Sequence, residues 1–133
     1  MSDNVRVVAV AFFDKIQQKY LIVRRGPEQS GAGFWEFPGG KVEKNESDQE
    51  ALVREIEEEL AFSMQPENLE YIGENLHCYP TKSILLVLYR HQEEIKKFVL
   101  SEHDAQVWVS LTEIHQYQLA PADIPFIEKL KKV

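Results

Sequence analysis

The chain has 133 residues, of which 44% are hydrophobic and 28% charged. This length and composition are typical of one globular domain and exclude a disordered chain, a collagen and a coiled coil. The 15 Lys and Arg against 22 Asp and Glu give a net charge of −7, which opposes binding to a nucleic-acid polymer or an anionic membrane. With one cysteine, no signal sequence and no apolar run long enough to span a membrane, we expect a single cytoplasmic domain over residues 1–133.

Two strands are expected at the start of the chain. Residues 5–13 and 20–23 are rich in β-branched and aromatic side chains, and the polar stretch between them is typical of a hairpin loop. Residues 24–33 form a Gly-rich polar loop that is long enough to be functional. Pro38-Gly39-Gly40 follows, and its two glycines allow the backbone to approach a ligand closely.

A helix is predicted from Ser47 to Leu60. Ser47 and Glu50 match the capping box, in which each side chain bonds to the other's backbone N–H. No Gly or Pro interrupts the segment, and Leu52, Ile56 and Leu60 recur every four residues. We therefore expect these three side chains to form the buried face.

The rest of the chain alternates between the two element types. Further strands are predicted at 69–72, 83–89 and 106–109, and short helices at 111–115 and 122–131, the last with Pro121 near its start. No internal repeat, linker or low-complexity segment is found. The sequence therefore predicts one mixed α/β domain.

The predicted helix carries a concentration of acid. Glu55, Glu58 and Glu59 fall within one arc of about 100° beside the apolar face, where their like charges repel one another. A hard divalent cation such as Mg²⁺ would compensate this repulsion, because it prefers oxygen ligands. The alternative is a solvated acidic face balanced by Arg54, and on the helix alone that alternative is favoured.

The wider context reverses this preference, because the segment resembles the Nudix box. The matching residues are Gly40-x5-Glu46-x7-Arg54-Glu55-Ile56-x-Glu58-Glu59-x-Ala61-Phe62. Ala61 departs from the box, which has a Gly there to end the helix in a left-handed conformation. We expect Ala61 either to strain that turn modestly or to end the helix differently. Phe62 places an aromatic ring in an aliphatic slot, and no ligand is lost.

The resemblance implies a Nudix fold of the α+β class, a mixed, partly antiparallel β-sheet sandwiched between helices. It also implies hydrolysis of a nucleoside diphosphate linked to another group, with Mg²⁺ or Mn²⁺ as cofactor. Glu55, Glu58 and Glu59 would be metal ligands, beside the carbonyl of Gly40 or Gly39. Arg54 would hold a box glutamate in orientation, and Glu46 would fix the loop–helix geometry or support the metal ligands.

Two further segments are similar to MutT-like enzymes, which remove oxidised purine nucleotides. Residues 34–43 match their W-E-F-P-G-G-K-[IV]-E segment, and residues 107–125 resemble especially their CTP pyrophosphohydrolase relatives, which share L-A-P-A-D-I-P. MutT-like proteins have a metal-binding or basic glutamate six residues before a tryptophan, and Glu102 precedes Trp108 by six. Glu55 and Glu102 are thus both candidates for the general base.

Substrate contacts follow from the same resemblance. Arg25 matches the arginine that holds substrate phosphates, and Lys41 and Lys82 are further candidates. Asp123 stands where MutT has an Asn that reads the purine edge. An ionised Asp would accept from an exocyclic amine of cytosine or guanine, whereas a protonated one would also donate. The backbone of Phe37 would contact the base, and Tyr79 would stack on it.

Plainer interpretations stand beside these assignments. Arg25 would be one of several surface arginines, Glu102 a solvated charge, and Asp123 a cap of the last helix. Cys78 has no activating partner and is expected to be a small buried hydrophobic residue. The four histidines show no metal-ligand spacing, so zinc is not expected.

The expected activity is Mg²⁺-dependent conversion of a nucleoside triphosphate to the monophosphate and pyrophosphate. The favoured substrate is an oxidised purine such as 8-oxo-dGTP, in nucleotide-pool sanitisation and DNA repair, and the alternative is CTP, dCTP or 5-methyl-dCTP. A nucleoside diphosphate sugar hydrolase, a catalytically silent nucleotide-binding domain and an acidic interaction module are also considered. The protein is expected to act as a monomer or homodimer.

Overall fold

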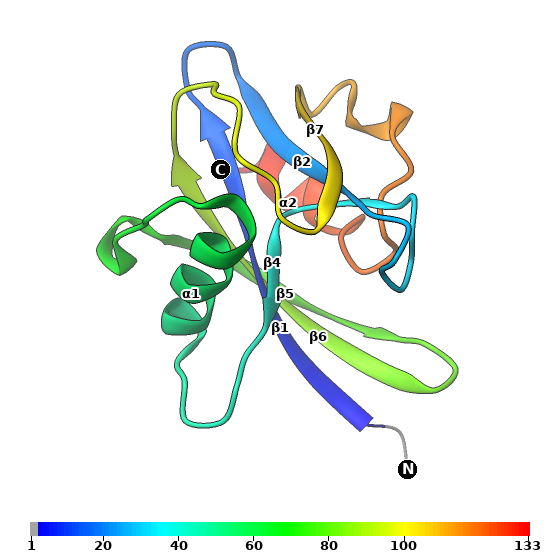
Figure 1. The fold of residues 1–133 in the computed structure, drawn as a ribbon. Coiled ribbons are helices and arrows are strands. Elements are labelled where there is room, and N and C mark those ends of the chain that lie inside the picture. Colours follow the sequence, from blue (N-terminus) through cyan, green and yellow to red (C-terminus); the bar gives the residue numbers. More distant parts are fainter. Residues whose placement is uncertain (1–2) are drawn as a thin grey trace.

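The computed structural model describes residues 3–133 (Figure 1). Its strands are β1 (Asp3–Asp14), β2 (Lys19–Arg25), β3 (Trp35–Glu36), β4 (Gly39–Lys41), β5 (Glu70–Cys78), β6 (Lys82–Gln92) and β7 (His103–Val109). Its helices are α1 (Asp48–Leu60) and α2 (Phe126–Lys131), with single 3₁₀ turns η1 (Pro66–Asn68) and η2 (Ile114–Gln116). None of the helices in this range is long and apolar enough to cross a membrane.

The strands form one mixed sheet. Its main order is β3-β2-β1-β6-β5, with β4 paired to β1 and β7 paired to β2. The β1–β6 pair is parallel from Asp3↔Lys82 to Phe13↔Gln92, and the other five strand pairs described in residues 3–133 are antiparallel. The predicted α+β class and the Nudix fold, a mixed sheet with helices, are confirmed.

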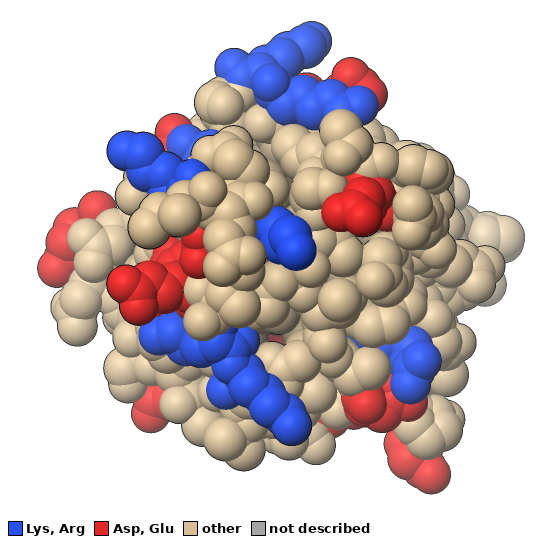
Figure 2. Space-filling model, turned by 90° about the horizontal axis from the view of Figure 1, so that it is seen from above, with Lys and Arg blue, Asp and Glu red and all other residues tan. Residues whose placement is uncertain are grey.

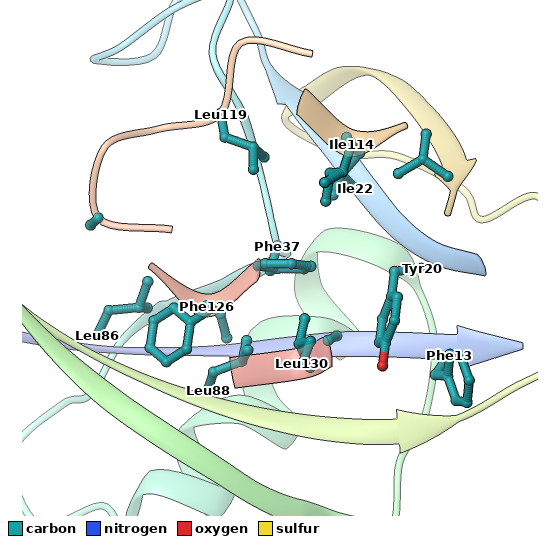
Figure 3. Close-up of a cluster of buried hydrophobic side chains, with 14 residues drawn as sticks. Phe13, Tyr20, Ile22, Phe37, Leu86, Leu88, Ile114, Leu119, Phe126 and Leu130 are labelled. Atoms are coloured by element: carbon teal, nitrogen blue, oxygen red, sulfur yellow. The ribbon is translucent and has the colours of Figure 1, made fainter. Parts of the chain in front are cut away.

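The two faces of the sheet carry separate cores because side chains alternate along β1. Val8, Val10 and Phe12 pack on the side of α1, whereas Ala9, Ala11 and Phe13 pack on the side of α2. In Figure 1 α1 accordingly lies to one side of the strands and α2 behind them. Figure 3 shows the second core, in which both Phe37 and Phe126 take part. The loop between β3 and β4 is therefore anchored in the core.

Helix α1 begins and ends as the sequence indicates. Ser47 Oγ accepts from Glu50 N at 3.1 Å, and Glu50 Oε1 accepts from Ser47 N at 2.9 Å, which completes the capping box. Leu52, Ile56 and Leu60 are buried. Ala61 ends the helix in the left-handed conformation, with φ 51° and ψ 39°, at a cost of about 1 kcal/mol for a residue with a Cβ.

Several predicted elements differ from those observed. The last helix begins only at Phe126, because residues 122–125 form turns and Pro125 is the N-cap. The predicted helix at 111–115 is reduced to the 3₁₀ turn at 114–116. Strands β3 and β4 were not predicted. They are two and three residues long. They are held in an extended conformation by pairing with β2 and β1, respectively.

The prediction for Cys78 is wrong, since this residue is exposed. It is the last residue of β5, which forms an edge of the sheet. Ser83 Oγ lies 3.4 Å from its sulfur. An edge strand leaves alternate side chains facing solvent whatever their polarity.

Candidate functional site

Arg54 joins helix α1 to the loop that precedes it. Its Nε and Nη2 donate to the two carboxylate oxygens of Glu46 at 2.8 and 2.9 Å, and its Nη1 donates to Glu55 at 2.9 Å. A further bond reaches the carbonyl of Lys41 at 3.1 Å. The contact with Arg54 lowers the pKa of Glu46 to about 2. Arg54 therefore holds the β4–α1 loop and orients Glu55, and Glu46 acts as its main partner.

Glu55 lies directly against the backbone of β4. A Cβ at position 40 would overlap its carboxylate, so any larger residue there would have to displace the Glu55 side chain. Burial raises the pKa of Glu55; the Arg54 contact opposes this effect, and the nearby charges of Glu58 and Glu102 add to it. The predicted ligands Gly40 and Glu55 are thus in contact.

Glu59 is the most buried acid of the helix, at 8% exposure. Its Oε2 has no hydrogen-bond partner in the described part of the chain. Burial, followed by the charges of Glu55, Glu36 and Glu102, raises its pKa to about 8, while Arg25 opposes the shift. Three carboxylates, from β3, α1 and the loop before β7, therefore lie close enough to Glu59 for their charges to act on it. We call Glu36, Glu55, Glu59 and Glu102 the acidic cluster.

Glu58 lies outside the acidic cluster. Its side chain is 60% exposed and its carboxylate is 3.5 Å from Arg54 Nη1. Together with Arg54, Val53 and Pro66 it lines an open surface depression of about 430 Å³. Glu58 therefore shares Arg54 with Glu55 at the surface, whereas Glu59 of the same helical arc is buried.

The donor set of the acidic cluster fits a hard divalent cation. Among residues 3–133, no three His, Cys, Asp or Glu side chains are already arranged around one point. However, Glu59 presents a buried oxygen without a partner, and Gly40 leaves open the space that Glu55 fills. Carboxylate and carbonyl oxygens are the ligands that Mg²⁺ and Mn²⁺ prefer.

Glu102 is exposed and lies just before β7. Its Oε2 accepts from Gln29 Nε2 at 3.2 Å. Its carbonyl oxygen packs against Gly26, where a Cβ would approach to 2.6 Å. The loop over residues 26–34 and the loop before β7 are therefore held together beside the acidic cluster.

Arg25 forms an ion pair that the sequence did not reveal. Its Nη1 donates to both oxygens of Glu36 at 3.0 and 3.1 Å, and its Nε donates to the carbonyl of Ser30. The ring nitrogen Nε2 of His103 lies 2.9 Å from Glu36. Glu36 and His103 were not predicted as site residues, because their partners are distant in sequence. The one available signal was the position of Glu36 in the W-E-F-P-G-G segment.

Asp123 lies at a second, more apolar side of the site. It is buried, and its Oδ2 accepts from the backbone N of Phe37 at 3.0 Å. Burial, followed by the charge of Glu36, raises its pKa well above the usual value. The side chain of Asp123 does not cap helix α2, whose N-cap Pro125 has no side-chain cap. The capping alternative is therefore wrong.

Tyr79 lies near Asp123. Burial and then the charge of Asp123 raise the pKa of the Tyr79 hydroxyl, whereas a hydrogen bond with the backbone of Ala122 lowers it. Asn75 Nδ2 donates to the Ala122 carbonyl at 3.1 Å and fixes this turn. The structure thus brings together the three predicted base contacts, Phe37, Tyr79 and Asp123.

The two candidate lysines are less closely placed. Lys41 is exposed and its carbonyl serves Arg54, while the carbonyl of Lys82 accepts from Tyr79 N at 2.7 Å. Neither amine forms an ion pair within residues 3–133. Figure 2 shows acidic and basic groups scattered over the upper face without one large patch of either sign.

The box helix, the acidic cluster and the mixed sheet define a Nudix hydrolase. Residues 3–130 match the NUDIX domain, and the chain belongs to this family. The CTP pyrophosphohydrolase of Escherichia coli K12 is 39% identical over 114 residues, which cover 83% of this chain and 80% of the relative. The 8-oxo-dGTP diphosphatase of the same organism is 30% identical over 126 residues, 95% and 96% of the two chains. The predicted MutT-like Nudix hydrolase is confirmed.

Solved structures agree with this assignment. The solution structure of the E. coli ORF135 protein has a TM-score of 0.81 at 36% identity and covers 98% of this chain and 91% of its own. The crystal structure of the MutT protein from Methanosarcina mazei Go1 has a TM-score of 0.87 at 24% identity, with 98% and 95% coverage. At this lower identity, the similarity to the Methanosarcina mazei protein supports the fold alone. The Nudix family typically uses a divalent metal.

Proposed function

We propose that this Nudix pyrophosphohydrolase converts a nucleoside triphosphate, with water, to the monophosphate and pyrophosphate. The observation that carries the proposal is the buried oxygen of Glu59, which has no hydrogen-bond partner among residues 3–133 and lies in the acidic cluster beside Arg25. Acidic side chains on one side and a guanidinium on the other suit a metal-bound polyphosphate. The curated relatives are named for nucleotide substrates, which agrees with this choice.

Glu55, Glu59, Glu102 and the carbonyl of Gly40 would hold Mg²⁺ or Mn²⁺. Glu58 would join them by turning away from Arg54. When bound, the metal neutralises phosphate charge and makes a nucleophile available from water. Arg54 would keep Glu55 ionised and oriented through their 2.9 Å contact. Arg25 would leave Glu36 and bind the substrate phosphates instead. Lys41 and Lys82 would provide further contacts to these phosphates.

The general base is proposed among two glutamates, Glu55 and Glu102. Glu55 is oriented by Arg54 and lies against Gly40. Glu102 is exposed, and its carboxylate accepts from Gln29 at 3.2 Å, so a modest rotation would turn it towards a water molecule. Replacement of the true base by Gln is expected to lower kcat by about 10²–10⁴-fold without unfolding the protein.

Asp123 is proposed to read the base. With its pKa raised, a protonated Asp123 would use one oxygen to accept from Phe37 and the other to donate. This pattern suits the N3 acceptor of cytosine, and identity is higher with the CTP pyrophosphohydrolase than with the 8-oxo-dGTP diphosphatase. Cytosine nucleotides are therefore our first candidate and 8-oxo-dGTP, in nucleotide-pool sanitisation, our second.

One assay tests the proposal. Purified protein is incubated with Mg²⁺ and, separately, CTP, dCTP, 5-methyl-dCTP, 8-oxo-dGTP, dGTP and a nucleoside diphosphate sugar. Products are identified by chromatography and pyrophosphate is measured, with Glu59→Gln as the inactive control. We expect pyrophosphate with a triphosphate. If no nucleotide is cleaved but one raises the melting temperature, the protein is a silent nucleotide-binding domain and the proposal is wrong.

A further inference from the structure

His103 is a buried polar side chain next to the acidic cluster. Its side chain is 1% exposed. Its Nε2 lies 2.9 Å from Glu36 Oε2, and its Nδ1 has no hydrogen-bond partner in residues 3–133. The contact with Glu36 is therefore the main interaction between the His103 side chain and the site.

The fold brings Glu36 and His103 together around the end of β2. Glu36 of β3 pairs with Val23, and His103 of β7 pairs with Arg25. The register of the β2–β7 pair shifts between Arg24 and Arg25. Such an irregularity re-aims a side chain, and here it accompanies the convergence of Arg25, Glu36 and His103 at one point.

The two partners of Glu36 differ in their freedom to move. Arg25 is 29% exposed at its side chain and reaches Glu36 from a long, flexible stem. His103 is fixed by its burial and by the backbone of β7. Because a carboxylate only accepts hydrogen bonds, the imidazole must donate its Nε2–H to Glu36. Arg25 can therefore turn away from Glu36 while His103 keeps its hydrogen bond to the Glu36 carboxylate.

We propose that His103 is a positioning residue that holds Glu36 in place when Arg25 turns to the substrate phosphates. This inference rests on the proposed function. Without the imidazole, Glu36 would be held by Arg25 alone and would compete with phosphate for the guanidinium. Loss of His103 should therefore weaken the binding of substrate by Arg25, and this effect should depend on the presence of Glu36.

Kinetics in a double-mutant cycle test this route. His103→Leu should lower kcat/KM about 10–100-fold, chiefly by raising KM, as is typical for partners that orient a site. In the Glu36→Gln background the same change should cost less than about threefold, because Gln does not hold Arg25 by charge. His103→Gln, which keeps an N–H donor, should recover most of the loss. Equal losses in both backgrounds would overturn the proposal.

His91 provides a matched control. It is also a buried histidine with an unpartnered Nδ1 in the described range, but it packs against Phe12 and Phe62. His91→Leu should leave kcat/KM within about twofold of the wild type. A loss as large as that of His103→Leu would indicate a general effect of removing a buried imidazole and would overturn the assignment.

NMR of the metal-free protein separates this inference from the proposed function. The ¹⁵N shifts of the His103 ring should show a proton on Nε2, and Glu36→Gln should shift the Nε2 resonance. A proton on Nδ1 alone, or no response to Glu36→Gln, would contradict the inference even in an active enzyme. If the wild type cleaves no nucleotide while these signals are as expected, the proposed function fails and the Glu36–His103 contact stands without its catalytic consequence.

Discussion

The carboxylate of Glu55 occupies the space that a side chain would fill at Gly40. Steric contact therefore favours glycine at position 40 of the box, because a Cβ there would overlap the Glu55 carboxylate that Arg54 holds. The loop and the helix of the box are two parts of one packed unit, and each constrains the other.

Gly40→Ala is expected to abolish activity by displacing Glu55. We expect kcat/KM to fall at least about 100-fold, because a misplacement of about 1 Å in a site has that effect, and the Mg²⁺-induced rise in melting temperature to disappear. Gly73→Ala is the matched control, since the added Cβ would meet only the end of the flexible Lys129 side chain. Full activity of Gly40→Ala would show that Glu55 is not confined in this way.

Arg54→Lys tests the network at the start of α1. Lysine has no planar pair of donors, so the bidentate contact with Glu46 should be lost. We expect the pKa of Glu46 to rise from about 2 towards its ordinary value, and activity to fall because Glu55 is no longer oriented. Carbon-13 NMR titration of the glutamate carboxyls measures the first effect. An unchanged pKa of Glu46 would mean that Arg54 is not its main partner.

Glu59 should make the metal-free protein less stable as pH rises. Its folded pKa of about 8 lies above the unfolded value of about 4.3, so the folded state binds more protons between these limits. The free energy of unfolding therefore decreases with rising pH across that window, by an amount on the order of a few kcal/mol. Glu59→Gln should remove this decrease of the free energy of unfolding with rising pH. It should also remove the stabilisation of the protein by Mg²⁺.

Urea denaturation from pH 5 to 8, without metal, measures this effect. Glu57→Gln is the control because Glu57 is an exposed acid of the same helix. Parallel pH profiles for the wild type and Glu59→Gln would contradict the burial of an unpaired carboxyl.

Asp123 should decide which base is used. Asp123→Asn keeps an acceptor for Phe37 N and a donor for N3 of cytosine, so it is expected to fold and to keep the preference for cytosine nucleotides. Asp123→Ala removes that acceptor and should cost about 1–3 kcal/mol of stability, because the Phe37 N–H is left unpaired. The ratio of kcat/KM for the two substrates is the measurement. Asp123→Ala lacks both the acceptor and the donor, so it should lower this ratio for cytosine nucleotides relative to 8-oxo-dGTP. An identical ratio in wild type and Asp123→Ala would remove Asp123 from base recognition.

Ala61→Gly should stabilise the protein without changing its activity. Ala61 has φ 51°, a conformation that glycine adopts without strain. We expect a gain of about 1 kcal/mol, or about 3–5 °C in melting temperature. Ala51→Gly, inside the same helix and buried, should instead be destabilising. A loss of stability in Ala61→Gly would mean that the helix end is not strained.

The sequence predicted those parts of the molecule that depend on local patterns. The capping box located the start of α1, and the repeat of Leu52, Ile56 and Leu60 identified its buried face. Strands β1, β2, β5, β6 and β7 were all anticipated, although with shorter bounds. The box and the MutT-like segments identified the family and with it the fold, and the NUDIX domain matches residues 3–130.

The parts that were missed depend on contacts between distant residues. Strand β3 is too short to show a periodicity, yet it carries Glu36 to Arg25 and His103. The separation of Glu58 from Glu59 follows from the attraction of Arg54 and the packing of α1 on the sheet. Helical spacing places these acids on one arc but does not determine which of them is buried.

The long parallel pairing of β1 with β6 has a consequence for how the protein is made. Its partners lie about 80 residues apart along the chain, so β1 cannot acquire this neighbour until most of the polypeptide has left the ribosome. Until then the apolar residues of β1 lack their main cover, and α1 has no complete sheet on which to dock. We therefore expect assembly of the catalytic centre to be a late and comparatively slow event of folding.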